Sequence, residues 1–159
     1  MGLNRFETSL NTWIDAEKAA LEFTTLLGKL FLDRTVELIL FRSQLIDRSA
    51  SVVLYKHSYA TNVVGYPLDI RDSLLLAKAI EACDIQSARL DIGKLNKEWT
   101  EEKENYKDAK EFICDKLKGA IGRKPSYDKP RDVVLFGFGR IGRLLLRELI
   151  IQGNGNQLR

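Results

Sequence analysis

The sequence predicts a mainly α-helical fold that ends in a short α/β unit. Apolar residues recur every three or four positions over most of residues 1–120, which is the period of amphipathic helices. Glycine, proline and charged residues then gather over 119–131. Residues 133–136 form an apolar run that leads directly into three closely spaced glycines. We therefore expect a helical domain over 1–120, a linker over 121–131 and the start of an α/β domain over 132–159.

The first two helical stretches are predicted from periodicity and end signals. One long amphipathic helix is expected near 10–31, with charged side chains between its apolar positions. A second helical stretch is expected over 36–64, broken or kinked near 42–47 and ended by Gly65 and Pro67. The apolar positions are Leu10, Trp13, Ile14, Leu21, Leu27, Leu30 and Phe31 in the first stretch, and Leu38, Ile39, Leu45, Ile46, Val52, Val53 and Tyr55 in the second.

The remaining helices of the N-terminal part are predicted in the same way. Asp69 is a suitable N-cap for a third helix over 70–82. Residues 84–94 are expected to be a short irregular piece. Residues 94–118 alternate charged and apolar positions, which is typical of one or two helices with a single buried stripe.

Three glycines carry the clearest functional signal of the chain. Gly137, Gly139 and Gly142 have the G-x-G-x-x-G spacing of a dinucleotide-binding turn between a strand and a helix. The first glycine permits the tight turn, the second lets the backbone approach a pyrophosphate, and the third lets the helix pack closely on the strand. The apolar run 133–136 suits the strand, and the N-terminus of the following helix binds phosphate charge. The motif predicts the first strand, turn and helix of a Rossmann NAD(P)-binding domain.

The sequence of this segment resembles that of a known enzyme family. Residues 137–143, Gly-Phe-Gly-Arg-Ile-Gly-Arg, are similar to the opening of the nucleotide-binding domain of glyceraldehyde-3-phosphate dehydrogenase. The resemblance implies that backbone amides around Arg140 and Ile141 face the pyrophosphate of NAD or NADP, while the three glycines shape the turn. Phe136 stands where the family usually has Asn, so no polar contact is expected from that side chain.

The resemblance extends into the N-terminal part of the chain. Residues 41–49 and 88–95 look like the helical extension of a longer bacterial form of glyceraldehyde-3-phosphate dehydrogenase. On this basis the similarity covers essentially the whole chain, although it is much less specific there than at the glycine turn.

No catalytic residue is assigned in this chain. The family uses a cysteine in a Ser-Cys-Thr-Thr-Asn segment, which is absent here, together with an activating histidine. Cys83 and Cys114 lie on helix-like stretches and are interpreted as buried core thiols. His57, the only histidine, is interpreted as a structural or solvent-exposed residue.

The predicted cofactor site is incomplete. An acid that binds the adenosine ribose is expected about 20 residues beyond the turn. Only 17 of the 159 residues follow Gly142, and Glu148 is the last acid among them. We therefore expect an N-terminal piece of a longer protein, which alone neither turns over substrate nor binds NAD or NADP tightly. Because the run 133–136 lacks its strand neighbours, it should pair with another copy, pack on the helical domain or abandon strand form.

Composition favours a cytoplasmic protein. The 25 basic and 22 acidic residues leave a net charge of +3, which implies no strongly acidic partner. The two cysteines have no metal-site spacing and suggest a reducing compartment. The sequence contains no secretory signal and no apolar stretch long enough for a membrane span, and we expect no membrane partner. The basic residues around the linker form no nucleic-acid-binding motif, so nucleic acid is not an expected partner.

Six charged residues lie within or beside apolar segments of the N-terminal part and permit two interpretations. They form an anion site or docking surface, or they are internal salt bridges and helix caps, which we favour because such pairs are common in helical domains. The six residues are Arg42, Asp47, Arg48, Arg89, Asp91 and Lys94.

Two functional hypotheses follow. In the first, which we prefer, the chain is the N-terminal portion of an NAD(P)-dependent, phosphorylating glyceraldehyde-3-phosphate dehydrogenase of glycolysis or gluconeogenesis. Its partners are then the rest of the dehydrogenase polypeptide and further copies in a homo-oligomer. In the second, the chain is a standalone helical oligomerisation or regulatory module with a vestigial glycine turn.

Overall fold

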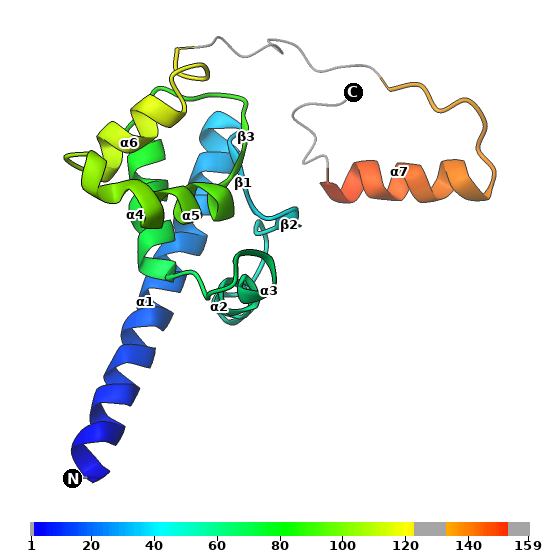
Figure 1. Ribbon diagram of the computed structural model, residues 1–159. Helices are drawn as coiled ribbons and strands as arrows, with labels where there is room; N and C mark the ends of the chain where they lie inside the picture. The colour runs from blue at the N-terminus through cyan, green and yellow to red at the C-terminus, as the bar shows by residue number, and fades with distance from the viewer. Residues whose placement is uncertain (1, 123–132, 153–159) are drawn as a thin grey trace. The chain divides into compact units, whose positions relative to one another are not determined.

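The computed structural model describes residues 2–122 and 133–152 (Figure 1). These residues are mainly helical, which confirms the predicted fold class. The chain divides into two compact units, Met1–Lys124 and Pro125–Arg159.

The first unit combines helices with a small sheet, and the described part of the second unit contains one helix. The elements are α1 (Gly2–Arg34), β1 (Glu37–Leu40), β2 (Ser43–Gln44), α2 (Ala50–Tyr59), α3 (Thr61–Val64), α4 (Ile70–Glu81), β3 (Arg89–Asp91), α5 (Ile92–Glu102), the 3-10 turn η1 (Lys103–Asn105), α6 (Ala109–Lys116) and α7 (Arg140–Gln152).

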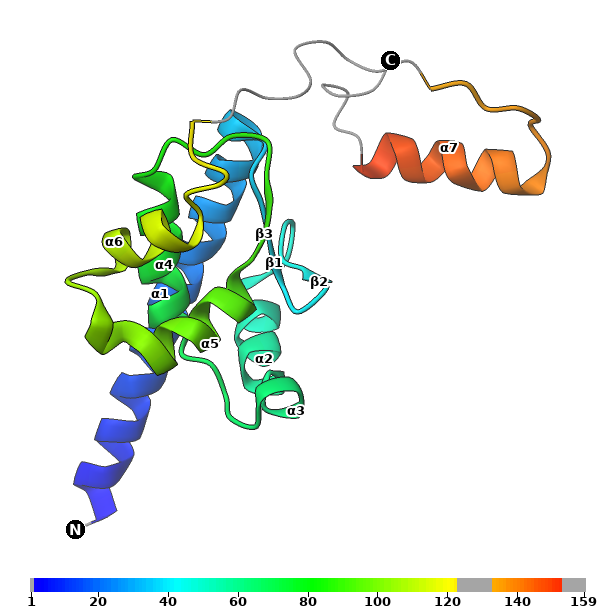
Figure 2. The same cartoon turned by 45° about the horizontal axis from the view of Figure 1, so that its top comes forward.

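Helix α1 confirms the predicted long first helix and exceeds its expected length. Its C-terminal half packs into the first unit, where Phe23, Leu27 and Leu30 are buried. Its N-terminal half extends beyond the other elements of the unit (Figures 1 and 2). Leu10 and Trp13 are therefore exposed, although their spacing continues the apolar pattern of the buried half.

The prediction of a helical stretch over 36–64, broken or kinked near 42–47, is wrong in its first part. Residues Glu37–Leu40 and Ser43–Gln44 form an antiparallel hairpin, and helical structure begins only at Ala50. Phe41 and Arg42 make the two-residue turn with φ of 44° and 73°. A hairpin turn with two positive φ values normally uses glycine or asparagine, so the sequence gives no signal for it.

The sheet has the strand order β2-β1-β3, and β1 pairs in parallel with β3. Leu38 lies opposite Leu90, and Ile39 lies opposite Asp91. Helices α2, α3 and α4 form the crossover that a parallel pair requires. The expectation of an irregular piece over 84–94 is therefore wrong, because it contains β3 and the start of α5.

The later helices confirm the predictions from capping and periodicity. Asp69 accepts a hydrogen bond from the Arg71 backbone N–H at 2.9 Å and caps α4. The stretch 94–118 forms helices, as expected, and α6 begins with reciprocal capping. Asp108 accepts from the Glu111 N–H at 2.8 Å, and the Glu111 carboxylate accepts from the Lys107 N–H at 2.8 Å.

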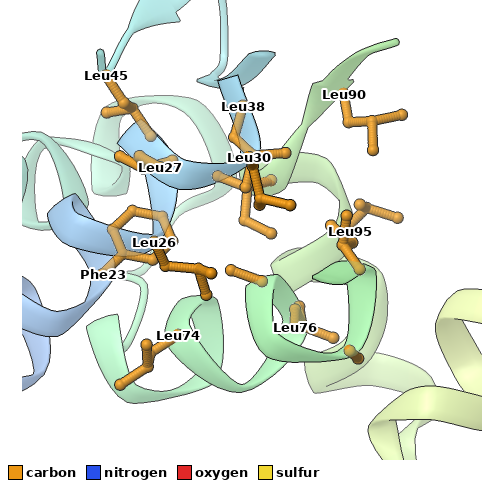
Figure 3. Packing of buried hydrophobic residues seen from close by; sticks show 14 of the residues in the cluster. Phe23, Leu26, Leu27, Leu30, Leu38, Leu45, Leu74, Leu76, Leu90 and Leu95 are labelled. Atoms are coloured by element: carbon orange, nitrogen blue, oxygen red, sulfur yellow. The ribbon is translucent and has the colours of Figure 1, made fainter. Parts of the chain in front are cut away.

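One continuous apolar core holds the first unit together. In Figure 3 the buried face of α1 lies over α4, with side chains of the sheet and of α5 beside them. Each large apolar side chain that is fully buried contributes about 1.5–3 kcal/mol of transfer free energy. The labelled members of this core are Phe23, Leu26, Leu27, Leu30, Leu38, Leu45, Leu74, Leu76, Leu90 and Leu95.

The second unit differs from the predicted strand, turn and helix in its first part. Residues 133–136 are not in strand form, and the side chains of Val134 and Phe136 are exposed. Loss of strand form is one of the three outcomes expected for an unpaired apolar strand. The turn and helix α7 follow as predicted.

The predicted linker over 121–131 is described only at its start. Ile121 pairs with Ile85 in an isolated bridge, and the Gly122 N–H donates to the Asp84 carbonyl at 2.8 Å. These first two residues of the predicted linker are thus part of the first unit, held by the segment that follows α4. Residues 123–131 lie outside the described residues, and the domain boundaries stay a prediction.

Candidate functional site

The glycine turn has the backbone geometry that its sequence predicts. Gly137 has a φ of +97°, which side-chain-bearing residues rarely adopt. A Cβ on Gly142 would overlap the carbonyl oxygen of Gly137, so the third glycine is required by close approach of the backbone. Gly139 has open space around its Cα, which leaves its backbone accessible to a ligand.

Helix α7 starts directly at this turn. The N–H of Arg143 donates to the carbonyl of Gly139 at 3.1 Å and begins the helical hydrogen-bond pattern. The N–H groups of Arg140, Ile141 and Gly142 precede that bond and have no partner within the helix. Such groups, together with the positive end of the helix dipole, attract an anionic group such as a phosphate.

Three arginines add positive charge on one face of the same helix. Arg140, Arg143 and Arg147 lie three and four residues apart and line a hollow of about 400 Å³ with Phe138, Leu144 and Leu146. The Nε of Arg143 also donates to the Gly139 carbonyl at 3.4 Å. The structure thus gathers the five predicted cofactor residues, Gly137, Gly139, Arg140, Ile141 and Gly142, at one turn. Their role in binding stays a prediction.

His57 is a buried structural residue, which confirms the first of the two interpretations. Its Nδ1 lies 2.8 Å from the Val53 carbonyl, and its Nε2 lies 2.9 Å from the Ser73 hydroxyl. Asn96 Nδ2 donates to the same hydroxyl at 2.8 Å. Burial lowers the pKa of His57 below its usual range. The imidazole, which is 2% exposed, is therefore neutral and out of reach of a substrate.

The two cysteines lie together, which the sequence did not indicate. Their sulfur atoms are 3.3 Å apart although the residues are 31 positions apart in the chain. Cys83 is buried and Cys114 is half-buried. The interpretation as core thiols is correct for Cys83, but the pairing is decided by the packing of α6 beside α4.

The six charged residues of the first unit fall into two groups. Arg89 forms an ion pair with Glu37 at 3.2 Å, and Asp91 caps α5, as the salt-bridge and cap interpretation expects. The other four are Arg42, Asp47, Arg48 and Lys94, and no ion pair involves them within residues 2–122.

Asp91 joins the two stretches of the N-terminal part that carry the family resemblance. Its Oδ1 accepts from the N–H groups of Phe41, Gly93 and Lys94 at 3.0, 3.1 and 3.3 Å. A Cβ on Gly93 would lie 2.9 Å from the Phe41 ring. Stretches 41–49 and 88–95 are thus packed against each other, and the packing explains the glycine at position 93.

Within the described ranges 2–122 and 133–152, no three His, Cys, Asp or Glu side chains are placed to hold a metal ion. The helices there are also too short or too polar to cross a bilayer.

Comparison with known proteins gives one relative and no family profile. None of the known protein-family profiles matches the chain. The chain is 30% identical over 138 residues to a glyceraldehyde-3-phosphate dehydrogenase-like protein of Pseudomonas aeruginosa strain UCBPP-PA14. The aligned part is 84% of this chain and 30% of the relative, so the chain spans less than a third of the relative's length.

The alignment reaches well into the helical part of the chain. Because 84% of 159 residues is about 134, and residues 132–159 supply only 28, at least about 100 aligned residues precede position 132. The similarity therefore does not rest on the glycine turn alone. It supports a distant relationship of this chain to glyceraldehyde-3-phosphate dehydrogenase-like proteins.

Proposed function

We propose that the chain is the N-terminal portion of an NAD(P)-dependent, phosphorylating glyceraldehyde-3-phosphate dehydrogenase. The observation that carries the proposal is the glycine turn, where Gly137 has its positive φ and Gly142, in the first turn of α7, lies too close to the Gly137 carbonyl for any side chain. The similarity to a glyceraldehyde-3-phosphate dehydrogenase-like protein supports the same reaction class. The chain then supplies the phosphate-binding corner of the cofactor site and a helical N-terminal domain.

The residues at the turn fit the pyrophosphate of a nicotinamide dinucleotide. The backbone N–H groups of Arg140 and Ile141 would hold it, since they precede the first helical hydrogen bond. Gly139 leaves room for the phosphate oxygens, and Arg143 adds charge nearby. The nicotinamide, when bound, accepts the hydride of the aldehyde substrate.

The thiols and the imidazole of this chain lie in the first unit, where they contact other core residues. Cys83 and Cys114 contact each other, and His57 is hydrogen-bonded to Ser73 in the core. No cysteine and histidine of the chain are therefore placed together for nucleophilic attack on an aldehyde. We expect no oxidation of a triose phosphate by the 159-residue chain alone.

Calorimetry with NAD and NADP tests the proposal on two proteins. The 159-residue chain should bind either cofactor weakly or not at all, because one corner of a site gives few contacts. The polypeptide encoded by the full reading frame of the source gene should bind one of them and oxidise glyceraldehyde 3-phosphate.

A glycine variant of the longer polypeptide locates the site. Gly142→Ala should weaken cofactor binding at least about tenfold, because its Cβ overlaps the Gly137 carbonyl and distorts the turn. Gly28→Ala is the matched control, since a Cβ at position 28 meets no atom within 4 Å. Micromolar binding by the 159-residue chain would show that the site is complete. Absence of binding by the longer polypeptide would contradict the function itself.

The alternative function, a standalone helical oligomerisation or regulatory module, is favoured by one observation. Among the residues that the structure describes, every member of the continuous apolar core belongs to the first unit. The downstream coding sequence distinguishes the two functions. A reading frame that continues into a Ser-Cys-Thr-Thr-Asn segment supports the dehydrogenase, and a native stop codon after Arg159 supports the module.

A further inference from the structure

The two cysteine sulfurs are close enough to react with each other. Cys83 Sγ and Cys114 Sγ are 3.3 Å apart, and a disulfide bond has a length of about 2.05 Å. Bond formation therefore needs an approach of only about 1.3 Å. In the structure both sulfurs are free thiols.

Both thiols are carried by fixed parts of the first unit. Cys83 follows the C-terminal end of α4, where its N–H donates to the Ile80 carbonyl at 3.1 Å. Arg34 holds the same end, because its Nη1 donates to the carbonyls of Glu81 and Cys83 at 2.8 and 2.9 Å. Cys114 lies in α6, next to the fully buried Ile113. The approach of the sulfurs is thus built into the packing of α4 and α6.

The two thiols differ in access to solvent. Cys83 is only 5% exposed, whereas Cys114 is half-buried. Burial, followed by the contact with Cys114, raises the pKa of Cys83 to about 11. Cys83 therefore remains a thiol at neutral pH, and an oxidant in solution reaches Cys114 first.

We propose that Cys83 and Cys114 form a redox-responsive thiol pair, which a glutathione-type disulfide converts into an intramolecular disulfide. Cys114 is the attacking thiol and Cys83 is the resolving thiol. Cys83 is followed directly by Asp84 and Ile85, which hold Gly122 and Ile121 near the end of the first unit. A disulfide at Cys83 therefore acts next to these contacts. The disulfide fastens α6 to the end of α4 beside these contacts.

The reaction balances in two exchange steps. The Cys114 thiolate, having lost its proton to water, attacks one sulfur of glutathione disulfide, and one glutathione thiolate leaves. The Cys83 thiol then gives up its proton and attacks the Cys114 sulfur of the mixed disulfide, and the second glutathione leaves. Two protein thiols are oxidised by two electrons in total, and one glutathione disulfide is reduced to two glutathiones.

Titration of the 159-residue chain with glutathione redox buffers tests the thiol pair. The oxidised product should lose two hydrogens, and peptide mapping without reductant should link the peptides that carry Cys83 and Cys114. Its Tm should be about 5–10 °C higher than that of the reduced protein, since the bond closes a loop of some 30 residues. Dithiothreitol should restore the original Tm.

Single-cysteine variants test the order of attack. In Cys83→Ser the glutathione on Cys114 should persist, because the resolving thiol is missing. In Cys114→Ser the buried Cys83 should react at least about tenfold more slowly than Cys114 does in the other variant. Circular dichroism checks that each variant is folded. The peptide mapping of the unaltered chain tests the disulfide even if a variant fails to fold.

Three results would overturn the proposal. They are a product in which each cysteine carries its own glutathione, a disulfide-linked dimer as the main product, and equal reaction rates of the two single-cysteine variants. Each would show that the sulfurs do not meet within one chain or are equally accessible.

Discussion

At the scale of single residues, one buried imidazole links three helices of the first unit. His57 belongs to α2, and its partner Ser73 belongs to α4. Asn96 of α5 donates to Ser73 and to the Asp69 carbonyl at 3.1 Å. The Val53 carbonyl can only accept, so Nδ1 of His57 carries the proton and Nε2 accepts from the Ser73 hydroxyl. Nε2 of His57 can accept this hydrogen bond only while the imidazole is neutral.

This network predicts a loss of stability in mild acid. Burial lowers the pKa of His57 in the folded state, whereas the unfolded chain binds the proton near pH 6.5. The free energy of unfolding should therefore fall as the pH drops below about 6.5, by at most ~1.4 kcal/mol per pH unit from this group. Urea unfolding between pH 7.5 and 5 measures the effect. His57→Gln should remove this part of the slope, and an imidazole NMR titration near pH 6.5 in the folded protein would contradict the prediction.

At the scale of elements, a single carboxylate connects a hairpin, a strand and a helix. Asp91 ends β3, caps α5 and accepts from the N–H of Phe41 in the β1–β2 turn. The turn residues Phe41 and Arg42 have positive φ, which costs conformational energy for residues with a side chain. The hydrogen bond to Asp91 offsets part of that cost and fixes the turn against the start of α5.

Removal of this carboxylate should weaken the first unit. Asp91→Ala should lower the free energy of unfolding by about 1–3 kcal/mol, because three N–H groups lose their acceptor. Asp91→Asn should retain most of the stability, since asparagine is also a good N-cap. Asp84→Ala is the control, because the Asp84 side chain is exposed and meets only Gln86 at 3.4 Å. Chemical denaturation measures all three, and equal losses in Asp91→Ala and Asp84→Ala would refute the role of Asp91.

At the scale of the whole molecule, the two units differ in how their apolar residues are used. The first unit buries its large apolar side chains in one core. In the second unit, helix α7 leaves Ile141, Leu144, Leu145 and Ile150 exposed. A helix of 13 residues that leaves these apolar side chains exposed is marginal in water. The proposed dehydrogenase accounts for this exposure, because a Rossmann helix packs on a sheet of several strands.

Amide hydrogen exchange should separate the two units. Amides of α4 should exchange only through extensive unfolding, because α4 is packed between α1, α5 and α6. Amides of α7 in the 159-residue chain should exchange close to the rate of an unstructured peptide. In the longer polypeptide the same amides should become protected. Equal protection of α4 and α7 in the 159-residue chain would contradict this prediction.

Local signals in the sequence determined most of the helices and the glycine turn. Amphipathic spacing predicted α1, and the caps and periodicity predicted α4 and the helices over 94–118. The glycine spacing predicted the backbone of the turn before α7, because positive φ and close approach are properties of the residues themselves.

Only the tertiary structure decided the sheet, the network around His57 and the thiol pair. The hairpin turn uses Phe41 and Arg42 where local rules expect glycine or asparagine, so long-range pairing of β1 with β3 and the contact with Asp91 impose it. Cys83 and Cys114 meet across 31 residues for the same reason. Contacts between distant segments depend on how whole elements pack, and no short window of the sequence contains that information.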